Sequence, residues 1–293
     1  MGFKVDSICL PCLLMHCVNE LPEIRDEEKK MEFVRMLMQR LSTIAEDLSA
    51  PEIDFGNRQL VEQYFGGNAE TFLREKELSN RFVMAKMADI KQRMDAAPDP
   101  LYAGLQFAVL GNYIDFSALQ EEVSFQQFDE MLDKAQDLDI DRNCYENFRA
   151  ELSQGKKLLY LADNAGEICF DRLFAEEIQR KFPHLEITFC VRGALAKNDA
   201  TIEDARLVGI PFPIVENGDG VCGTNLKVLP EQARKAFREA DVILSKGQGN
   251  VETLFSSGYN IYYAFLVKCP RFMTTFKKPK MTPMFLREKD MNP

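Results

Sequence analysis

An acidic residue and an amide residue stand side by side where an apolar run in the middle of the chain ends. Asp163 and Asn164 directly follow Lys157–Ala162, and a helical pattern begins just after them. Carboxylate and amide oxygens are hard ligands that suit Mg2+ or Mn2+, and open α/β sheets bind ligands at the carboxyl ends of their strands. The alternative is a helix cap, with Asn164 and Glu167 forming a capping box. That alternative leaves Asp163 unexplained.

A second acid follows the next expected strand. Asp199 lies in the loop after Glu186–Val191, and this loop is expected beside the one that carries Asp163. Asp199 is therefore a candidate third oxygen ligand of the same cation. A structural alternative is that Asp199 or Thr201 starts the following helix, with Asp204 completing a capping box from Thr201.

A lysine precedes a glycine-rich turn at the end of the fourth expected strand. The order Lys246-Gly247-Gln248-Gly249 combines a point charge with bare backbone amides at a helix start, which suits a phosphate group. The segment is not a Walker A loop, and glycines alone simply make turns. In the first half, Asn112 and Asp115 interrupt an apolar stretch, so they either cap a helix or face a site between the two halves.

Soft ligands gather near the N-terminus. Cys9 and Cys12 have a spacing typical of metal ligands, and His16 would share their face if the segment were helical. Free cysteines are often packed in cores, so the alternative is that these thiols are buried. We therefore treat Cys9 and Cys12 as a possible second metal site, which Cys269 can join in space.

The pattern of apolar residues changes near residue 155. Residues 22–138 show helical spacing, as in Phe33, Leu37 and Leu41, and predict a helix bundle. After Gly155, short β-rich runs alternate with amphipathic stretches, which predicts a doubly wound, mainly parallel, Rossmann-like sheet. We expect a helical domain at 1–154 and an α/β domain at 155–293. The expected strands are 157–162, 186–191, 213–215, 242–245 and 261–267, and the expected helices between them are 168–181, 202–208, 230–239 and 251–256.

Bulk composition limits the partners. The chain has 293 residues and a formal net charge of -10, which would repel a nucleic acid backbone. Its apolar runs are shorter than the roughly 20 residues that span a bilayer, so we expect no membrane segment. Eight cysteines are too few for a disulfide scaffold, and no leader pattern opens the sequence. We expect a cytoplasmic protein, and its oligomeric state is not predicted.

The motifs together resemble the damage-control phosphatase family, in the branch with an early Cys-x-x-Cys. The resemblance spans Cys9 to Cys269 and rests on an ordered set of segments: Gly111-Asn112 with Asp115, Asp163 to Glu167, Asn198 to Thr201 with Asp204, Gly223-Thr224, and Ser245 to Asn250 with Glu252.

The resemblance implies hydrolysis of phosphate monoesters of small metabolites, either sugar phosphates or damaged phospho-cofactors. It also implies a divalent metal (Mn2+, Mg2+, Co2+ or Ni2+) held by Asp163, Asn164 and Asp199, with Lys246 and neighbouring amides on the phosphate. The other residues that we expect around the substrate are Gly166, Glu167, Arg192, Gly247, Asn250, Asn112 and Asp115.

The expected mechanism is attack of a metal-activated water, with Asp199 or Glu167 orienting it and Lys246 balancing charge. A covalent aspartyl route is disfavoured because Ala165 stands where such enzymes carry a second Asp. Two rival functions remain. One is a nucleotide- or methyl-donor-dependent transferase, whose Gly-x-Gly-x-x-Gly turn is absent after the first strand. The other is a noncatalytic module that holds zinc through its cysteines.

Overall fold

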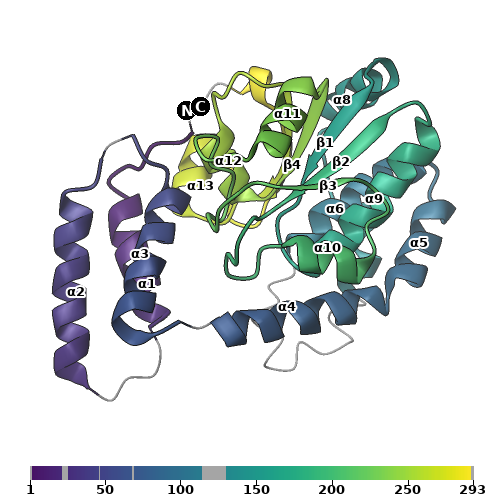
Figure 1. The fold of residues 1–293 in the computed structure, drawn as a ribbon. Helices are drawn as coiled ribbons and strands as arrows, with labels where there is room; N and C mark the ends of the chain where they lie inside the picture. The colour runs from purple at the N-terminus through teal and green to yellow at the C-terminus, as the bar shows by residue number, and fades with distance from the viewer. Residues whose placement is uncertain (1, 22–25, 46, 68, 114–129, 292–293) are drawn as a thin grey trace.

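A six-stranded sheet forms the centre of the α/β half (Figure 1). The computed structural model describes residues 2–21, 26–45, 47–67, 69–113 and 130–291. The strands are β1 (Lys157–Leu161), β2 (Glu186–Val191), β3 (Ile214–Glu216), β4 (Val242–Lys246), β5 (Ile261–Leu266) and β6 (Pro283–Arg287). Their order is β3-β2-β1-β4-β5-β6, with the pairs from β3 to β5 parallel and β6 antiparallel. The predicted doubly wound sheet is confirmed, and its order reverses between β1 and β4.

The strand β6 was not predicted. It is short and begins with Pro283 after a lysine- and proline-rich segment, a composition that favours a loop. A proline is tolerated at the first residue of an edge strand, where its missing N–H removes no central hydrogen bond. The antiparallel partner β5 supplies the pairing that local sequence does not indicate.

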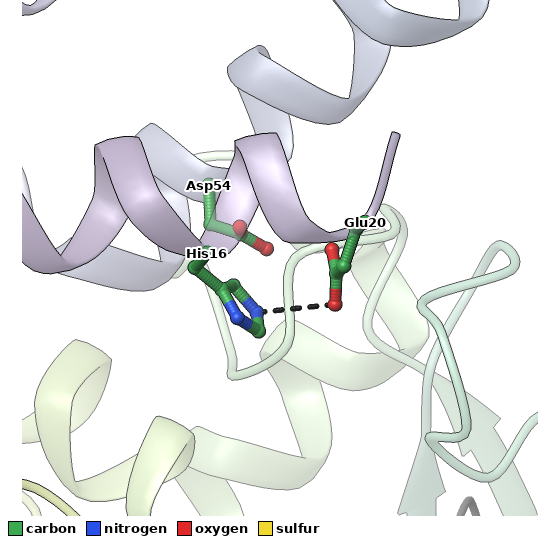
Figure 2. A group of neighbouring side chains, drawn as sticks. All are labelled: His16, Glu20 and Asp54. Carbon is green, nitrogen blue, oxygen red and sulfur yellow. Dashed lines mark ion pairs between the residues drawn. The ribbon is translucent and has the colours of Figure 1, made fainter. Parts of the chain in front are cut away.

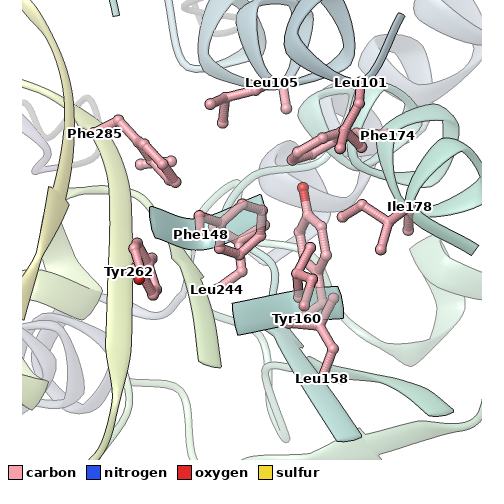
Figure 3. Close-up of a cluster of buried hydrophobic side chains, with 14 of the residues drawn as sticks. Leu101, Leu105, Phe148, Leu158, Tyr160, Phe174, Ile178, Leu244, Tyr262 and Phe285 are labelled. Atoms are coloured by element: carbon pink, nitrogen blue, oxygen red, sulfur yellow. The ribbon is translucent and has the colours of Figure 1, made fainter. Parts of the chain in front are cut away.

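Alternate side chains of the strands feed two different cores, as a period of two requires. Leu158 and Tyr160 of β1 face a cluster with α6 (Pro100–Gly111), α8 (Arg142–Gln154) and α9 (Glu167–Lys181), part of which Figure 3 shows. Leu159 and Leu161 face the opposite cluster, with α11 (Glu231–Glu239), α12 (Gln248–Leu254) and α13 (Pro270–Phe276). Helices therefore cover both faces of the sheet.

The helix α6 is apolar except for Gln106 and is buried from Leu101 to Gly111. It approaches α9 closely because it carries glycines at the contact: a Cβ on Gly111 would lie 2.9 Å from Cγ of Glu167. This close packing brings the C-terminal end of α6 to the edge of the sheet. Asn112, which follows Gly111, is placed there by it.

The helices of the first half divide between two cores. The helices α1 (Cys9–Asn19), α2 (Glu27–Ser42) and α3 (Ala50–Phe65), which we call the cap helices, pack around Leu13, Phe33 and Leu37 in a cluster of their own. Figure 1 shows them to one side of the sheet, and α4 (Ala69–Met84) leads from them toward α5 (Met87–Ala96). The turn between α8 and β1 coincides with the boundary expected near residue 155, and the division into two domains there stays a prediction.

Three short elements complete the described chain: α10 (Ile202–Val208), η2 (Ala135–Asp137) and η3 (Glu288–Asp290). Within the described residues, no helix has the length and apolar character needed to cross a bilayer.

Candidate active site at the carboxyl edge of the sheet

The loops after β1 and β2 are bound to each other and bring the predicted ligands together. Asn164 and Asp199 form an isolated antiparallel β-bridge. The N–H of Ala200 donates to the carbonyl of Asp163 at 2.7 Å. As a result Asp163, Asn164 and Asp199 line one cavity of about 460 Å³. The cavity lies at the point where strand order reverses, which is where doubly wound sheets bind ligands.

Gly247 forms the floor beneath Asp163. Its φ is 80°, a left-handed value that favours glycine. A Cβ at this position would lie 2.0 Å from Oδ2 of Asp163. The glycine after β4 is therefore needed so that the Asp163 carboxylate can rest against the backbone of the next strand.

Two amide side chains join Asp163 to a second, deeper carboxylate. Nδ2 of Asn112 donates to Oδ2 of Asp163 and to Oε2 of Glu167, both at 2.9 Å. Nδ2 of Asn164 donates to the same two oxygens, both at 2.8 Å. Asn112 thus binds Asp163 from its buried side, and its expected contact with the substrate stays a prediction. The other predicted residue of that segment, Asp115, lies outside the described residues.

Lys246 lies in the buried layer behind the acids, and its predicted contact with phosphate stays a prediction. Its Nζ donates to Glu167 at 2.6 Å, to Asp171 at 2.7 Å and to the carbonyl of Ala108 at 2.8 Å. The side chain is fully buried, and its three N–H groups have three protein acceptors. Burial lowers its pKa, but the two carboxylates outweigh that effect and raise the pKa above its ordinary value. Lys246 is a buried counterion of Glu167.

Arg192 is the second buried cation. Its Nε donates to Asp199 at 2.6 Å, its Nη2 lies 3.4 Å from Oδ1 of Asp163, and its Nη1 donates to Asn250 at 3.2 Å. Asn250 in turn donates to the carbonyl of Lys246 and accepts from Thr224. Only 1% of Arg192 is exposed. The guanidinium therefore fixes the two acids from behind.

The predicted phosphate-binding residues form a supporting layer and are absent from the cavity wall as the described residues define it. Each has a protein partner or a packing role at the back of the acids. The expected substrate contacts of this layer stay predictions; its members are Gly166, Glu167, Arg192, Lys246, Gly247 and Asn250. The N–H of Gly166, for example, donates to Oδ1 of Asn80 at 2.7 Å.

The acids at the site outnumber the buried cations beside them. Burial, with the neighbouring carboxylates of Asp199 and Glu167, raises the pKa of Asp163 to about 7. Burial also raises the pKa of Asp199, although Arg192 partly opposes it. Burial opposes ionisation of Glu167 as well, but Lys246 and the two amide groups lower its pKa overall. A further cation at Asp163 and Asp199 would relieve this imbalance.

The two capping alternatives have opposite outcomes. Helix α9 begins at Glu167 with Gly166 as its N-cap at φ 75°, so Asn164 does not cap it. Helix α10 does begin with the Thr201 and Asp204 capping box. Asp204 also pairs with Lys76 of α4 at 2.8 Å, so that carboxylate ties α4 to the sheet.

The opposite wall of the cavity comes from the cap helices and α13. It includes His16 and Asp54 from the cap helices and Lys268 and Arg271 around the start of α13. Figure 2 shows His16, Glu20 and Asp54 turned toward one another like metal ligands. Lys197 of the same chain already serves them as a cation.

Lys197 reaches from the loop of Asp199 into this group. Its Nζ lies 2.6 Å from Nε2 of His16, 2.9 Å from Glu20 and 3.3 Å from Asp54. Because an ammonium has donors alone, Nε2 of His16 accepts in this contact. The group is therefore an ion-paired link between the cap helices and the sheet.

The metal site predicted at Cys9 and Cys12 stays a prediction. Cys9 is buried, Cys12 is exposed, and both line the cavity with Cys269. Among the described residues, no set of three ligands that includes either Cys9 or Cys12 brings its atoms within 4.8 Å of one another. Cys9 instead accepts a weak contact from Arg271 at 3.7 Å.

Two functional features were missed from the sequence. Asp171 pairs with Lys246, and its spacing of four from Glu167 places both acids on one face of α9. That spacing was an available signal for a cation between them. Lys197 and Asp54 are 143 residues apart in the sequence, so no local pattern indicates that they pair.

The fold and the site define a class of α/β enzyme that binds its ligand at the switch point of a doubly wound sheet. Residues 5–282 match the damage-control phosphatase ARMT1-like domain. The chain is 32% identical over 276 residues to a damage-control phosphatase of Archaeoglobus fulgidus, covering 91% of this chain and 93% of that one. It is 30% identical to a damage-control phosphatase of Pyrococcus horikoshii, covering 98% and 99%.

A solved structure agrees with these matches. The crystal structure of a DUF89 family protein from Pyrococcus horikoshii superposes with a TM-score of 0.83 at 26% identity, over 98% of this chain and 99% of that one. This chain belongs to the damage-control phosphatase ARMT1-like family. The predicted family and the predicted class of enzyme, a phosphatase, are confirmed.

Proposed function

We propose that the chain hydrolyses phosphate monoesters of small metabolites with a divalent cation held by Asp163, Asn164 and Asp199. The observation that carries this proposal is the excess of buried carboxylate at the switch point. Two acids with raised pKa values face one cavity. Of the two cations behind them, Arg192 is shared by both acids, and Lys246 is paired with Glu167 and Asp171. The family membership supports the reaction class.

The donor set fits a hard divalent cation. Among the described residues, none donates a hydrogen bond to Oδ1 of Asn164 or to Oδ1 of Asp199, so both oxygens are available as ligands. Oxygen donors suit Mg2+ and Mn2+, and Co2+ or Ni2+ is compatible with them. A bound ion would polarise the phosphoryl group and supply a more acidic water.

We propose that Lys268, and not Lys246, contacts the phosphate group. Lys268 lines the cavity with an exposed side chain, and its charge lowers the pKa of nearby Asp163. Among the described residues its ammonium has no ion-pair partner, whereas Lys197 pairs with Glu20 and Arg271 pairs with Asp6. Lys268 is therefore the lysine of this wall with a free charge for a phosphate group.

Asp199 is proposed to orient the attacking water. Glu167, the other candidate, is fully buried and holds Lys246 and both amide groups, so it has no path to the substrate. Asp199 lines the cavity, and Arg192 fixes one of its oxygens. The remaining oxygen is positioned by that bond, which keeps the carboxylate in one rotamer.

The test is an assay of metal-stripped protein on a panel of sugar and cofactor phosphates, with Mg2+, Mn2+, Co2+ or Ni2+ restored one at a time. We expect phosphate release that depends on the added ion. We also expect the ion to raise the melting temperature of the wild type, and to do so much less in the Asp163→Asn variant. Absence of turnover with every ion and every ester would overturn the proposal.

Metal analysis of the protein as purified separates this proposal from the zinc module. Stoichiometric zinc that survives loss of Asp163 and accompanies no phosphatase activity would favour the module.

A cytoplasmic location and the absence of nucleic acid binding remain predictions from composition and charge. The partner implied by the proposal is a small phosphorylated metabolite.

A further inference from the structure

A second cavity of about 430 Å³ adjoins the first. It lies between α3, the start of α4 and the loop after β2. Asp54 and Lys197 belong to the linings of both cavities. The two cavities are therefore neighbours, separated by the ion pair that these two side chains make at 3.3 Å.

The second cavity has an apolar wall built from three separate segments. Phe55 comes from α3, Phe72 from α4 and Leu195 from the loop that also carries Asp199. All three side chains are half-buried, and none belongs to or packs against the four hydrophobic clusters of the described residues. Large apolar groups that converge on a hollow without joining a core are typical of a ligand-binding wall.

The boundary toward the first cavity is polar and internally paired. Asp54 accepts from Arg58 at 3.2 Å, and Arg58 also donates to the carbonyl of Gly220 at 2.6 Å. Lys197 adopts a left-handed φ of 51°, which is unfavourable for a lysine and is held by the loop that positions Asp199. Because these charges satisfy one another, the boundary favours neutral hydroxyl or amide groups over a second phosphate.

We propose that the second cavity is the leaving-group subsite of the phosphatase. In this arrangement, which rests on the proposed function, the phosphoryl group lies at Asp163, Asn164 and Asp199. The organic part passes Lys197 and Asp54 and places an apolar segment of several carbons against Phe55, Phe72 and Leu195. The substrate class is then a phosphate monoester with an extended, partly apolar leaving group, in preference to a simple sugar phosphate.

Ethyl phosphate and hexyl phosphate provide the direct test. Both are primary alkyl monoesters with similar leaving groups, so their intrinsic reactivity is alike and a difference in kcat/KM reports contacts with the longer chain. For the wild type with its activating metal we expect kcat/KM for hexyl phosphate to exceed that for ethyl phosphate by on the order of tenfold or more.

Variants of α4 locate the effect. Phe72→Ala should lower kcat/KM for hexyl phosphate by on the order of tenfold, and Phe72→Leu should lower it less. Both should leave ethyl phosphate within about twofold. Leu73→Ala is the matched control, because Leu73 is the next residue of the same helix and is 55% exposed. It should change neither ester by more than about twofold.

Equal kcat/KM values for the two esters in the wild type would overturn the leaving-group subsite while leaving the phosphatase intact. So would equal losses on both esters in Phe72→Ala. If the wild type hydrolyses neither alkyl ester and no member of the sugar and cofactor panel, the proposed function is overturned and this inference with it. The two failures are thus distinguishable.

Discussion

The two walls of the catalytic cavity are built in contrasting ways. The sheet wall presents Asp163 and Asp199, supported by the buried cations Lys246 and Arg192, which donate to acceptors of the protein. The wall from the cap helices presents His16, whose side chain is 50% exposed, beside Glu20, whose side chain is 34% exposed. The proposed chemistry needs fixed geometry and is assigned to the more buried wall, and the wall proposed to contact the variable part of a substrate is the more exposed one.

The ion pairs of the two walls illustrate the same contrast. Lys246 and its partners Glu167 and Asp171 are all fully buried, so removing one member leaves uncompensated charge in a low-dielectric interior. Lys197 is itself largely buried, but its partner Glu20 is a third exposed, and its other partner, Asp54, has a second cation in Arg58. Loss of Lys197 therefore leaves less uncompensated charge than loss of Lys246. The following predictions test whether the walls differ as this comparison requires.

The largest effect is expected at the sheet wall itself. Asp163→Asn preserves shape but removes the charge that a divalent cation needs, so kcat/KM should fall by on the order of 10³-fold or more. The fold should persist, because the substitution also relieves repulsion with Asp199 and Glu167. Steady-state kinetics and circular dichroism check both parts. Near wild-type activity in a folded variant would remove Asp163 from the metal site.

The next effect separates the supporting layer from the links of the cap helices. Lys246→Met should reduce the free energy of unfolding by about 3–5 kcal/mol, because Glu167 and Asp171 lose their buried counterion. Lys197→Met, its counterpart in the opposite wall, should cost less, about 1–2 kcal/mol, because Glu20 is partly exposed and Asp54 keeps its pair with Arg58. Urea denaturation of the two variants measures the difference. Equal losses would contradict the contrast between the walls.

The position of Lys246 also shows how far sequence reasoning reaches. The motif of a lysine before a glycine-rich turn suggests a phosphate site, but the motif alone does not show which way the lysine side chain points. The alternation of β4 held the answer: Val242 and Leu244 face the cluster under α6 and α9, so Lys246, two residues further, must face that side too. With Glu167 and Asp171 four residues apart on α9, that periodicity predicts a buried ion pair.

Other features followed directly from local patterns. The strands β1, β2, β4 and β5 were predictable because buried parallel strands form continuous apolar runs. Asp163 stood out because it follows one of those runs directly, and Asp199 because it lies in the loop after the neighbouring run. The cap wall was not predictable in this way. The pairing of Lys197 with Asp54 and the convergence of Phe55, Phe72 and Leu195 depend on how α3 and α4 pack over the sheet, which no local spacing determines.

A smaller, pH-dependent effect tests the shared edge of the two walls, where Glu252 of α12 lines the cavity. Burial raises the pKa of Glu252 to about 7, although Arg271 partly opposes this. The folded protein therefore binds more protons than the unfolded chain between its ordinary pKa and about 7. The contribution to stability is present at low pH and is lost as the pH rises through 7.

In metal-free protein, Glu252→Gln should increase the free energy of unfolding at pH 8 by about 2–3 kcal/mol and change it little at pH 4.5. Urea denaturation of wild type and variant across this range measures the difference. A matched control is Glu231→Gln, at a fully exposed position where no such gain is expected. A constant difference between wild type and the Glu252 variant at all pH values would exclude titration of Glu252 as its cause.

The smallest effect is expected at Cys12 of the wall made by the cap helices. Its thiol is exposed and, within the described part of the chain, belongs to no preassembled set of metal ligands. Cys12→Ala should therefore keep kcat/KM within about twofold and leave the metal content of the protein unchanged. The same measurements on Cys9→Ala separate a thiol site from a packing effect, because Cys9 is buried in the core of the cap helices. Loss of a bound zinc ion in both variants would show that cap-helix motion assembles a thiolate site, and the wall would then have a chemical role of its own.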